Sequence, residues 1–294
     1  MKTGFSIFLA AFVALGVSWL GLVYGPLKQL GGAKETLVLQ SSDKWPMPPT
    51  GDATLGLQVY RANGCAACHT VQIRQTGAVD TLSITDLGVH KAADFKDFIS
   101  SLMVVPELMN YSNSIVCSLR QWNGSVPKLL FSGEDTAMVS LLGDKLKAVG
   151  VKTEARVVAT GPDIARGWGV RQSVAADYLY DTPVQLGSLR AGPDLANLGV
   201  RAPEVKWQLQ HLYAPRSLVK NSTMPAFRHL FSVRKVGAQP APDALVLPRE
   251  FAPAVGFEVL PTAEARQLAA YLTSLKANVP LYEAPFTPIT AANK

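Results

Sequence analysis

The stretch Cys65-Ala-Ala-Cys68-His69 constrains this chain more than any other part of its sequence. Two thiols separated by two residues and followed at once by an imidazole form the attachment pattern of haem c. The spacing has a chemical reason, because the thiols add to the two vinyl groups of the porphyrin and the next residue presents its imidazole to iron. We therefore predict one covalent haem c, bound by Cys65 and Cys68, with His69 as an axial ligand of the iron.

Two other uses of a cysteine pair fit the sequence less well. A zinc site needs a fourth ligand at a recognisable spacing, but the chain has no second C-x-x-C pair, and the nearest other histidine is His90. A redox pair of the thioredoxin type needs a βαβ context after a strand, whereas a helical pattern precedes Cys65. The third cysteine, Cys117, stands alone, and we expect it to be a small buried hydrophobic residue.

An electron-transfer haem with six ligands also needs a distal side chain. Met224 lies in the segment Asn221-Ser-Thr-Met-Pro-Ala-Phe227, where proline fixes the backbone and the flexible thioether can reach iron. We predict Met224 as the second axial ligand and keep His229 as its main rival. His211 is expected to be a packed or propionate-side residue. The remaining candidates are Met47 and His90, together with Met103, Met109 and Met138, which lie in apolar, helix-like surroundings that favour a core role.

Ligation by histidine and methionine raises the reduction potential relative to more basic ligand pairs. Because both axial positions are then filled, the predicted task is electron transfer and not catalysis at this haem. The loop Gly192-Pro193-Asp194-Leu195 resembles the loop of class I cytochromes c whose proline carbonyl accepts a hydrogen bond from the proximal imidazole. A plain turn is the alternative for this loop. We predict Pro193 and Arg190 as cofactor-binding residues.

The N-terminal region reads as a membrane anchor. The run from Phe5 to Pro26 holds no charged residue, and roughly 21 helical residues span about 31 Å, close to the hydrocarbon core of about 30 Å. A secretory signal peptide is the rival, but its apolar region should be shorter and end in a small-x-small cleavage site. Lysines on both flanks leave the positive-inside rule indecisive.

The predicted haem sets the orientation of this anchor, because haem is attached to such sites outside the cytoplasmic membrane. We expect a single-pass protein of a bacterial cytoplasmic membrane with its haem domain on the periplasmic side, in contact with membrane lipid. The formal net charge of +6 comes from scattered basic residues. Without a run of Lys and Arg, the composition predicts no nucleic-acid partner.

The sequence predicts a mainly α fold with several parts. Residues 1–28 form the transmembrane anchor and residues 29–50 a linker, because the run Trp45-Pro-Met-Pro-Pro-Thr-Gly51 can be neither helix nor central strand. A class I cytochrome c-like domain follows in two pieces. The boundaries are 51–75 for its first piece, 76–160 for an inserted small α+β module, 161–280 for its second piece, and 281–294 for a tail.

Apolar spacing and capping residues predict several elements. In the cytochrome c domain they are a helix leading into Gly64-Cys65 and a loop with short extended pieces at 236–261. A final helix follows, which Thr262 caps and beyond which Pro280 lies. Its apolar face consists of Leu268, Tyr271, Leu272 and Leu275. In the insertion they are a helix at 135–149, a cap at Gly150 and a strand at 151–159.

Three stretches of the chain resemble the mono-haem subunit II, or FixO/CcoO, family of cbb3-type cytochrome c oxidases. They are VYRANGCAACHTVQIR, DIARGWGVRQSVAADYLYDTPVQLGSLRAGPDLANLG and HLYAPRSLVKNSTMPAF. With the anchor and the final helix they cover very roughly half of the chain. The middle stretch is the specific one, because generic cytochromes c lack it.

The resemblance implies a function. Cys65, Cys68 and His69 would bind haem c, with Met224 as the distal ligand, and electrons would pass through this haem toward a haem-copper subunit that reduces oxygen and pumps protons. The chain itself would then be an electron-transfer subunit and not the oxygen-reducing site. Its expected partners are that catalytic subunit and other cytochrome c subunits of the complex, with a soluble cytochrome c as a further candidate.

The insertion at 76–160 departs from the family, in which VQIR and RGWG usually lie closer together, and it leaves the partner surface open. Two other functions also stay open. One is the anchored mono-haem subunit of a nitric oxide reductase, a family that lacks the RGWG…YDTPV…GPDLANLG stretch. The other is a free-standing membrane-bound electron carrier.

Overall fold

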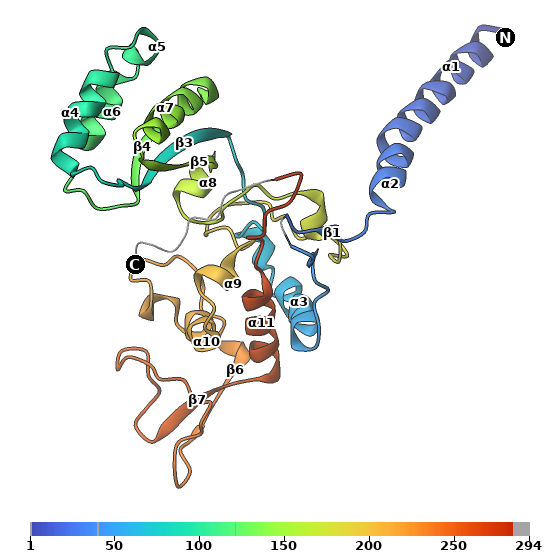
Figure 1. The fold of residues 1–294 in the computed structure, drawn as a ribbon. Helices are drawn as coiled ribbons and strands as arrows, with labels where there is room; N and C mark the ends of the chain where they lie inside the picture. The colour runs from blue at the N-terminus through green and yellow to red at the C-terminus, as the bar shows by residue number, and fades with distance from the viewer. Residues whose placement is uncertain (1, 40, 121, 285–294) are drawn as a thin grey trace. The chain divides into compact units, whose positions relative to one another are not determined.

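The computed structural model describes residues 2–39, 41–120 and 122–284 (Figure 1). This part of the chain divides into two compact units. The first unit combines the N-terminal region up to Val71 with Ser173–Glu283, and the second is built on Gln72–Gln172. The second unit begins four residues before the predicted insertion of 76–160 and ends twelve residues after it.

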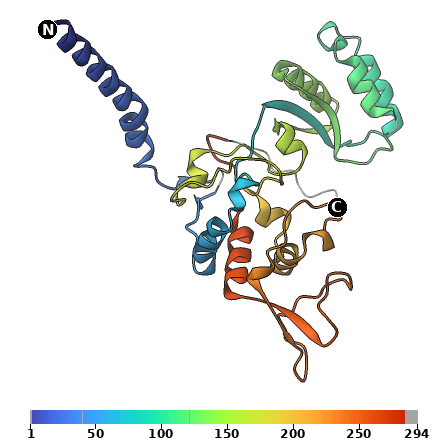
Figure 2. The ribbon, with the colours of Figure 1, turned by 180° about the vertical axis from the view of Figure 1, so that it is seen from behind.

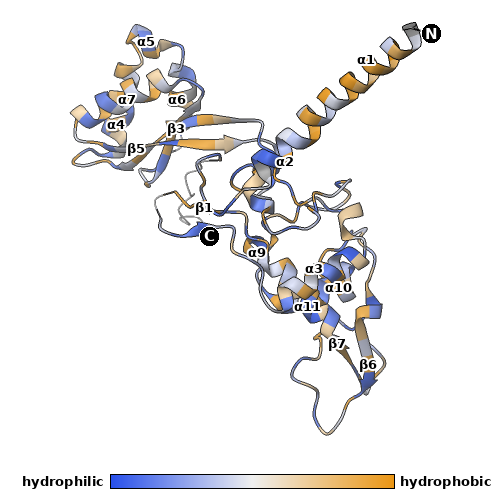
Figure 3. Ribbon diagram, turned by 90° about the vertical axis from the view of Figure 1, so that its right-hand side faces the viewer, coloured by the Kyte–Doolittle hydropathy of each residue, from blue (hydrophilic) through white to orange (hydrophobic). Residues whose placement is uncertain are grey.

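The N-terminal region is one continuous run of helix. It consists of α1 (Lys2–Trp19), a π-helical turn η1 (Leu20–Tyr24) and α2 (Gly25–Leu30). The segment Gly4–Gln29 has a mean hydropathy of 2.2, and none of its most apolar window is buried. In Figure 3 the orange colour of hydrophobic residues recurs along this helix. By length and composition the helix can cross a membrane, although a signal sequence near an N-terminus meets the same criteria.

Two helices from opposite ends of the first unit pack directly against each other. They are α3 (Asp52–Ala62) and α11 (Ala263–Ser274), which lie side by side in Figures 1 and 2. Gly56 makes this close approach possible, because a Cβ atom there would lie 1.9 Å from the carbonyl oxygen of Gln267. The rings of Tyr60 and Tyr271 meet beside it at 5.2 Å between centroids.

The sequence analysis predicted both helices. Thr262 caps α11 as expected, since its hydroxyl oxygen accepts a hydrogen bond from the amide of Ala265 at 3.3 Å. Leu268, Tyr271 and Leu272 are buried on the predicted face, whereas Leu275 follows the end of the helix.

Short elements complete the first unit. In chain order they are β1 (Thr36–Leu37), β2 (Lys44–Trp45), η2 (Cys65–Ala67), η3 (Ala175–Tyr178), α9 (Leu198–Arg201), α10 (Val205–Tyr213), η4 (Pro215–Ser217), η5 (Arg228–Leu230), β6 (Phe231–Lys235) and β7 (Phe257–Pro261). The β1–β2 pair lies in the segment predicted as a linker. The proline-rich segment 236–256 joins the antiparallel strands β6 and β7. The buried Glu258 carboxylate holds this segment by accepting a hydrogen bond from the amide of Ala241 at 2.7 Å.

The second unit is a three-stranded antiparallel sheet covered by helices. The strand order is β4 (Lys128–Gly133), β3 (Gly77–Asp86) and β5 (Lys152–Thr160), with β3 in the centre. Its helices are α4 (Ala92–Leu102), α5 (Pro106–Met109), α6 (Ser112–Leu119), α7 (Thr136–Ala148) and α8 (Pro162–Ala165). Apolar side chains from β3, β4 and helices α4 to α7 form one core of their own, which includes Leu82, Phe95 and Leu142.

The predicted helix and strand at the end of the insertion are α7 and β5. Asp135 caps α7 by accepting a hydrogen bond from the amide of Met138 at 2.9 Å. Gly150 ends the helix with a φ of 84°, the left-handed conformation expected of a C-terminal cap. The two ends of the insertion lie next to each other. Gly77 pairs with Thr160, and the amide of Thr76 donates a hydrogen bond to the carbonyl of Thr160 at 2.9 Å.

Two expectations for the insertion are wrong. Cys117 is exposed and not buried. On α6, Ile115 and Leu119 lie one helical turn apart and face the core, so that Cys117, midway between them, lies on the opposite face. Met109 was expected in the core but is 55% exposed, because Leu108 fills the core position of the short helix α5. Met103 and Met138 are core residues, as predicted.

The contact between α3 and α11 makes a testable prediction. Gly56→Ala should lower the free energy of unfolding by about 1–3 kcal/mol, because the added methyl group would overlap backbone atoms of α11 and force the helices apart. Thermal unfolding of the purified protein measures this as a Tm lowered by several degrees. Gln58→Ala, at an exposed position of the same helix, is the control and should leave Tm nearly unchanged. Equal stability of the two variants would contradict the close contact.

Candidate functional site

The Cys65–His69 motif forms a tight turn at the end of α3. Gly64 follows the helix in the left-handed conformation, with a φ of 65°, and reverses the chain. The amide of Cys68 donates to the carbonyl of Cys65 at 3.1 Å, and the amide of His69 donates to the same oxygen at 3.0 Å. This turn presents both thiols and the imidazole from one short, hydrogen-bonded segment.

A second segment, residues 186–195, lies against the motif, and we call it the strap. Four backbone hydrogen bonds of 2.8–3.0 Å join it to residues 66–71. Their donor–acceptor pairs are Val71–Leu186, Ser188–Ala66, Gly192–Cys68 and Leu195–Thr70. Gly187 has a φ of 82°, and a Cβ atom there would lie 2.1 Å from the carbonyl oxygen of His69. The strap is therefore shaped by its glycines to fit against the motif.

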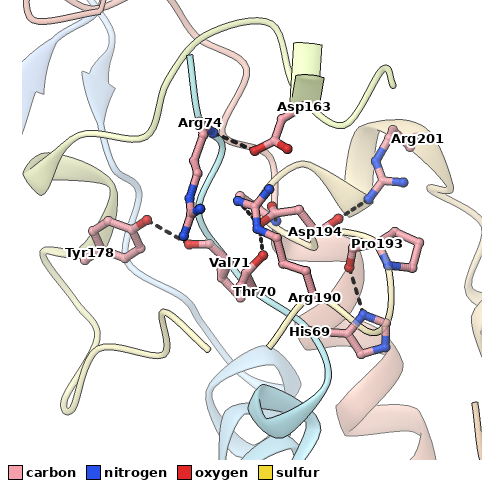
Figure 4. A network of polar contacts seen from close by, with 11 residues as sticks. His69, Thr70, Val71, Arg74, Asp163, Tyr178, Arg190, Pro193, Asp194 and Arg201 are labelled. Atoms are coloured by element: carbon pink, nitrogen blue, oxygen red, sulfur yellow. Dashed lines mark hydrogen bonds and ion pairs between the residues drawn. The ribbon is translucent and has the colours of Figure 1, made fainter. Parts of the chain in front are cut away.

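The strap also fixes the His69 imidazole. The Nδ1 atom of His69 lies 2.8 Å from the carbonyl oxygen of Pro193, so that Nδ1 carries the proton and donates it to that acceptor (Figure 4). The lone pair of the neutral ring is then on Nε2, the other possible ligand atom. Gly192 leaves space for the ring, because a Cβ atom there would lie 2.2 Å from its Cε1 atom.

A buried carboxylate follows Pro193 in the strap. Asp194 is fully buried and accepts a hydrogen bond from the hydroxyl of Thr70, the residue after His69, at 2.5 Å (Figure 4). Arg190 lies 3.9 Å from the same carboxylate oxygen, and the Arg201 guanidinium donates to the backbone carbonyl of Asp194. The structure thus gives Arg190 an acidic partner, and its contact with a cofactor stays a prediction.

The two thiols differ in environment from a redox-active pair. Cys68 is exposed and Cys65 is half-buried. Burial raises the pKa of the Cys65 thiol to about 11, so that it stays protonated at neutral pH. Redox-active cysteines have a lowered pKa instead. Within the described ranges, no group of three or more His, Cys, Asp or Glu side chains is arranged to hold a metal ion.

Met224 lies half-buried in an irregular segment between η4 and η5. Its amide donates to the hydroxyl oxygen of Ser222 at 3.3 Å, and the amide of Phe227 donates to the carbonyl of Leu212 at 2.9 Å. His229, the rival ligand, has its Nε2 atom 2.8 Å from the side-chain oxygen of Asn63, two residues before Cys65. His229 therefore ties the Met224 segment to the end of α3.

Several buried polar atoms near the motif lack a hydrogen-bond partner among the described residues. They include the hydroxyl of Tyr60 and the Nδ1 atom of His211. His211 stacks on Trp207 at 4.8 Å, and burial lowers its pKa. Buried polar groups are normally paired. Unpaired buried groups in the unit that holds His69 fit a bound cofactor that carries polar substituents.

His69, Pro193 and the cysteine pair were predicted from the sequence, and they lie together in the structure. Thr70 and Asp194, whose side chains join the motif to the strap, were not predicted. Neither were Gly187 and Gly192 as residues that allow close contact. The glycines adjoining Pro193 and Ser188 were a possible signal, because glycine often marks a place where two backbone segments approach closely.

The site thus combines a cysteine pair and an oriented imidazole on one short turn. Residues 159–275 match the family model for the mono-heme subunit of cytochrome C oxidase, FixO. Over this region the chain is similar to the FixO family of mono-haem cytochrome c oxidase subunits. A comparison with curated proteins finds no match. The matched region contains the strap and Met224 but not Cys65–His69, so that the strap is the structural link between the family region and the motif.

Proposed function

We propose that the protein is a membrane-anchored mono-haem cytochrome c subunit that relays electrons to the haem-copper catalytic subunit of a cbb3-type oxidase. One observation carries the proposal. The imidazole of a C-x-x-C-H motif donates to a proline carbonyl in a strap that belongs to the region matching the mono-heme oxidase subunit family. This hydrogen bond fixes the tautomer and the orientation of an axial ligand and increases its basicity.

The residues for holding haem c are on the described chain. In this proposal Cys65 and Cys68 form the thioether bonds, His69 offers Nε2, and Met224 supplies the second axial ligand. When bound, the haem supplies a one-electron couple.

The site favours electron transfer over catalysis. Two protein ligands on the axis would leave no position for a substrate, and His/Met ligation gives a higher potential than more basic ligand pairs. The half-buried Met224 lies on a segment tied through Phe227 and His229 to the rest of the unit, which supports a rigid ligand set. Oxygen reduction would then occur in the partner subunit.

The N-terminal helix gives this subunit its location. Its hydropathy of 2.2 over an exposed segment, together with the match of residues 159–275 to an oxidase subunit family, supports an uncleaved anchor. In the proposal the haem unit lies on the periplasmic side of a bacterial cytoplasmic membrane, because haem c is attached there. The other subunits of the complex would meet the haem unit on that side.

Covalent attachment is tested by removing both thiols. A Cys65→Ser/Cys68→Ser variant should lose all haem that survives denaturing electrophoresis, because no sulfur remains to form the thioether bonds. Haem staining and the mass of the intact chain measure the loss. Cys117→Ser, which changes the exposed cysteine of the insertion, is the matched control and should keep one haem. Haem staining that persists in the double variant would show that the attachment site is elsewhere.

The distal ligand is tested by Met224→Ala. This change should abolish the weak methionine–iron charge-transfer band near the red end of the oxidised spectrum, because the thioether is lost. Met47→Ala is the control, since Met47 is 75% exposed and should not contribute to the band. A band of normal strength in Met224→Ala would assign the ligand to another residue.

The assignment to an oxidase is tested by gentle detergent extraction of the tagged full chain from its native membranes. A polytopic haem-copper subunit should co-purify with it, and the purified complex should reduce oxygen with a reduced cytochrome as the donor. A haem protein that purifies alone would support the free-standing carrier instead. A partner that reduces nitric oxide but not oxygen would assign the chain to the other class of complex.

A further inference from the structure

Asp194 is the one carboxylate among the described residues that joins both segments of the site. It is fully buried, and its Oδ2 atom accepts the hydroxyl of Thr70 at 2.5 Å. Its Oδ1 atom accepts the amide of Ala196 at 2.8 Å. A buried carboxylate is costly unless it is hydrogen-bonded and paired with a cation, and Asp194 meets both conditions.

The position of Asp194 couples it to the His69 imidazole on two sides. Thr70, its hydroxyl donor, directly follows His69 in the chain. Pro193, whose carbonyl accepts the His69 Nδ1 proton, directly precedes Asp194. The amide of Leu195 donates to the carbonyl of Thr70 at 2.8 Å and closes the same link through the backbone. A displacement of the Asp194 side chain therefore moves the acceptor of the imidazole proton.

Two arginines lie beside this carboxylate. Arg190 is 3.9 Å away, and Arg201 donates to the backbone carbonyl of Asp194 itself (Figure 4). Burial lowers the pKa of Arg201, whereas the negative charge of Asp194 acts in the opposite direction. Removing the negative charge of Asp194 would thus leave the positive charges of Arg190 and Arg201 less balanced in the surroundings of the His69 imidazole.

We propose that Asp194 is a positioning residue that lowers the reduction potential of the site, by fixing the Pro193 carbonyl against His69 and by keeping a buried negative charge beside it. This inference rests on the proposed haem c function. The oxidised centre has one more positive charge than the reduced centre, so that a nearby negative charge stabilises the oxidised form. Charges interact more strongly in the protein interior than in water, and a firm hydrogen bond to Nδ1 acts in the same direction.

The first test is the midpoint potential of Asp194→Asn in the purified, haem-loaded full chain. Asparagine keeps the size and one acceptor oxygen but removes the charge. The electron equilibrium should shift about tenfold toward the reduced form, which is a rise of about 59 mV for one electron. Asp243→Asn is the matched control. The Asp243 carboxylate is about half exposed in its pair with Arg266, and salt and solvent screen its charge, so that the potential should stay unchanged.

A second pair of variants separates positioning from charge and stays informative if Asp194→Asn does not fold. Thr70→Val removes the hydroxyl donor, whereas Thr70→Ser keeps it. In the reduced protein, NMR of the His69 Nδ1 proton should show several-fold faster exchange with solvent in Thr70→Val, and near wild-type exchange in Thr70→Ser. The serine variant is thus the conservative rescue.

The outcomes distinguish this inference from the proposed function. A wild-type chain without covalent haem would overturn the proposed function. A haem-loaded Asp194→Asn protein with the wild-type potential would overturn this inference alone, and so would an equal shift in Asp243→Asn. Equal proton exchange in the two Thr70 variants would remove the positioning role.

Discussion

The hydrogen bond from His69 to the Pro193 carbonyl is the contact on which the site depends. It joins two segments that are far apart in the sequence and holds the imidazole in one tautomer and one orientation. The backbone bonds of the strap, the glycines that let it approach and the Asp194–Thr70 link all support this one contact. An imidazole that is already oriented would need little reorganisation when a group bound to it gained or lost charge.

The hydrogen bond from His69 to Pro193 also joins the C-x-x-C-H motif to the region 159–275 that matches the family model. The matched region begins at residue 159, well after His69, so that similarity to the family over this region does not itself include the C-x-x-C-H motif. Because the strap lies inside the matched region and is hydrogen-bonded to residues 66–71, the two observations refer to one site. The strap has a shape that fits against the C-x-x-C-H turn, because Gly187 and Gly192 leave space for it.

Local signals in the sequence predicted much of the fold. The cap at Thr262, the apolar face of α11, the helix at 135–149 and its cap at Gly150 depend on nearby residues, and they appear in the structure. Non-local features were not predictable in this way. The Asp194–Thr70 bond joins residues 124 positions apart, and the exposure of Cys117 depends on which face of α6 meets the core. The helices α4 to α6 were not predicted, because Pro106 and a polar segment around residues 110–114 break the apolar periodicity.

The hydrogen bond between Thr76 and Thr160, which lie at the two ends of the insertion, has an evolutionary consequence. The two ends of this module are hydrogen-bonded neighbours, so that the module can replace a short turn in the rest of the chain. Loop-closure entropy rises only slowly with length, by about 0.6 kcal/mol for each doubling, and a segment with its own core need not rely on the host for stability. Selection can therefore enlarge, replace or trim this branch of the chain while the first unit keeps its own fold.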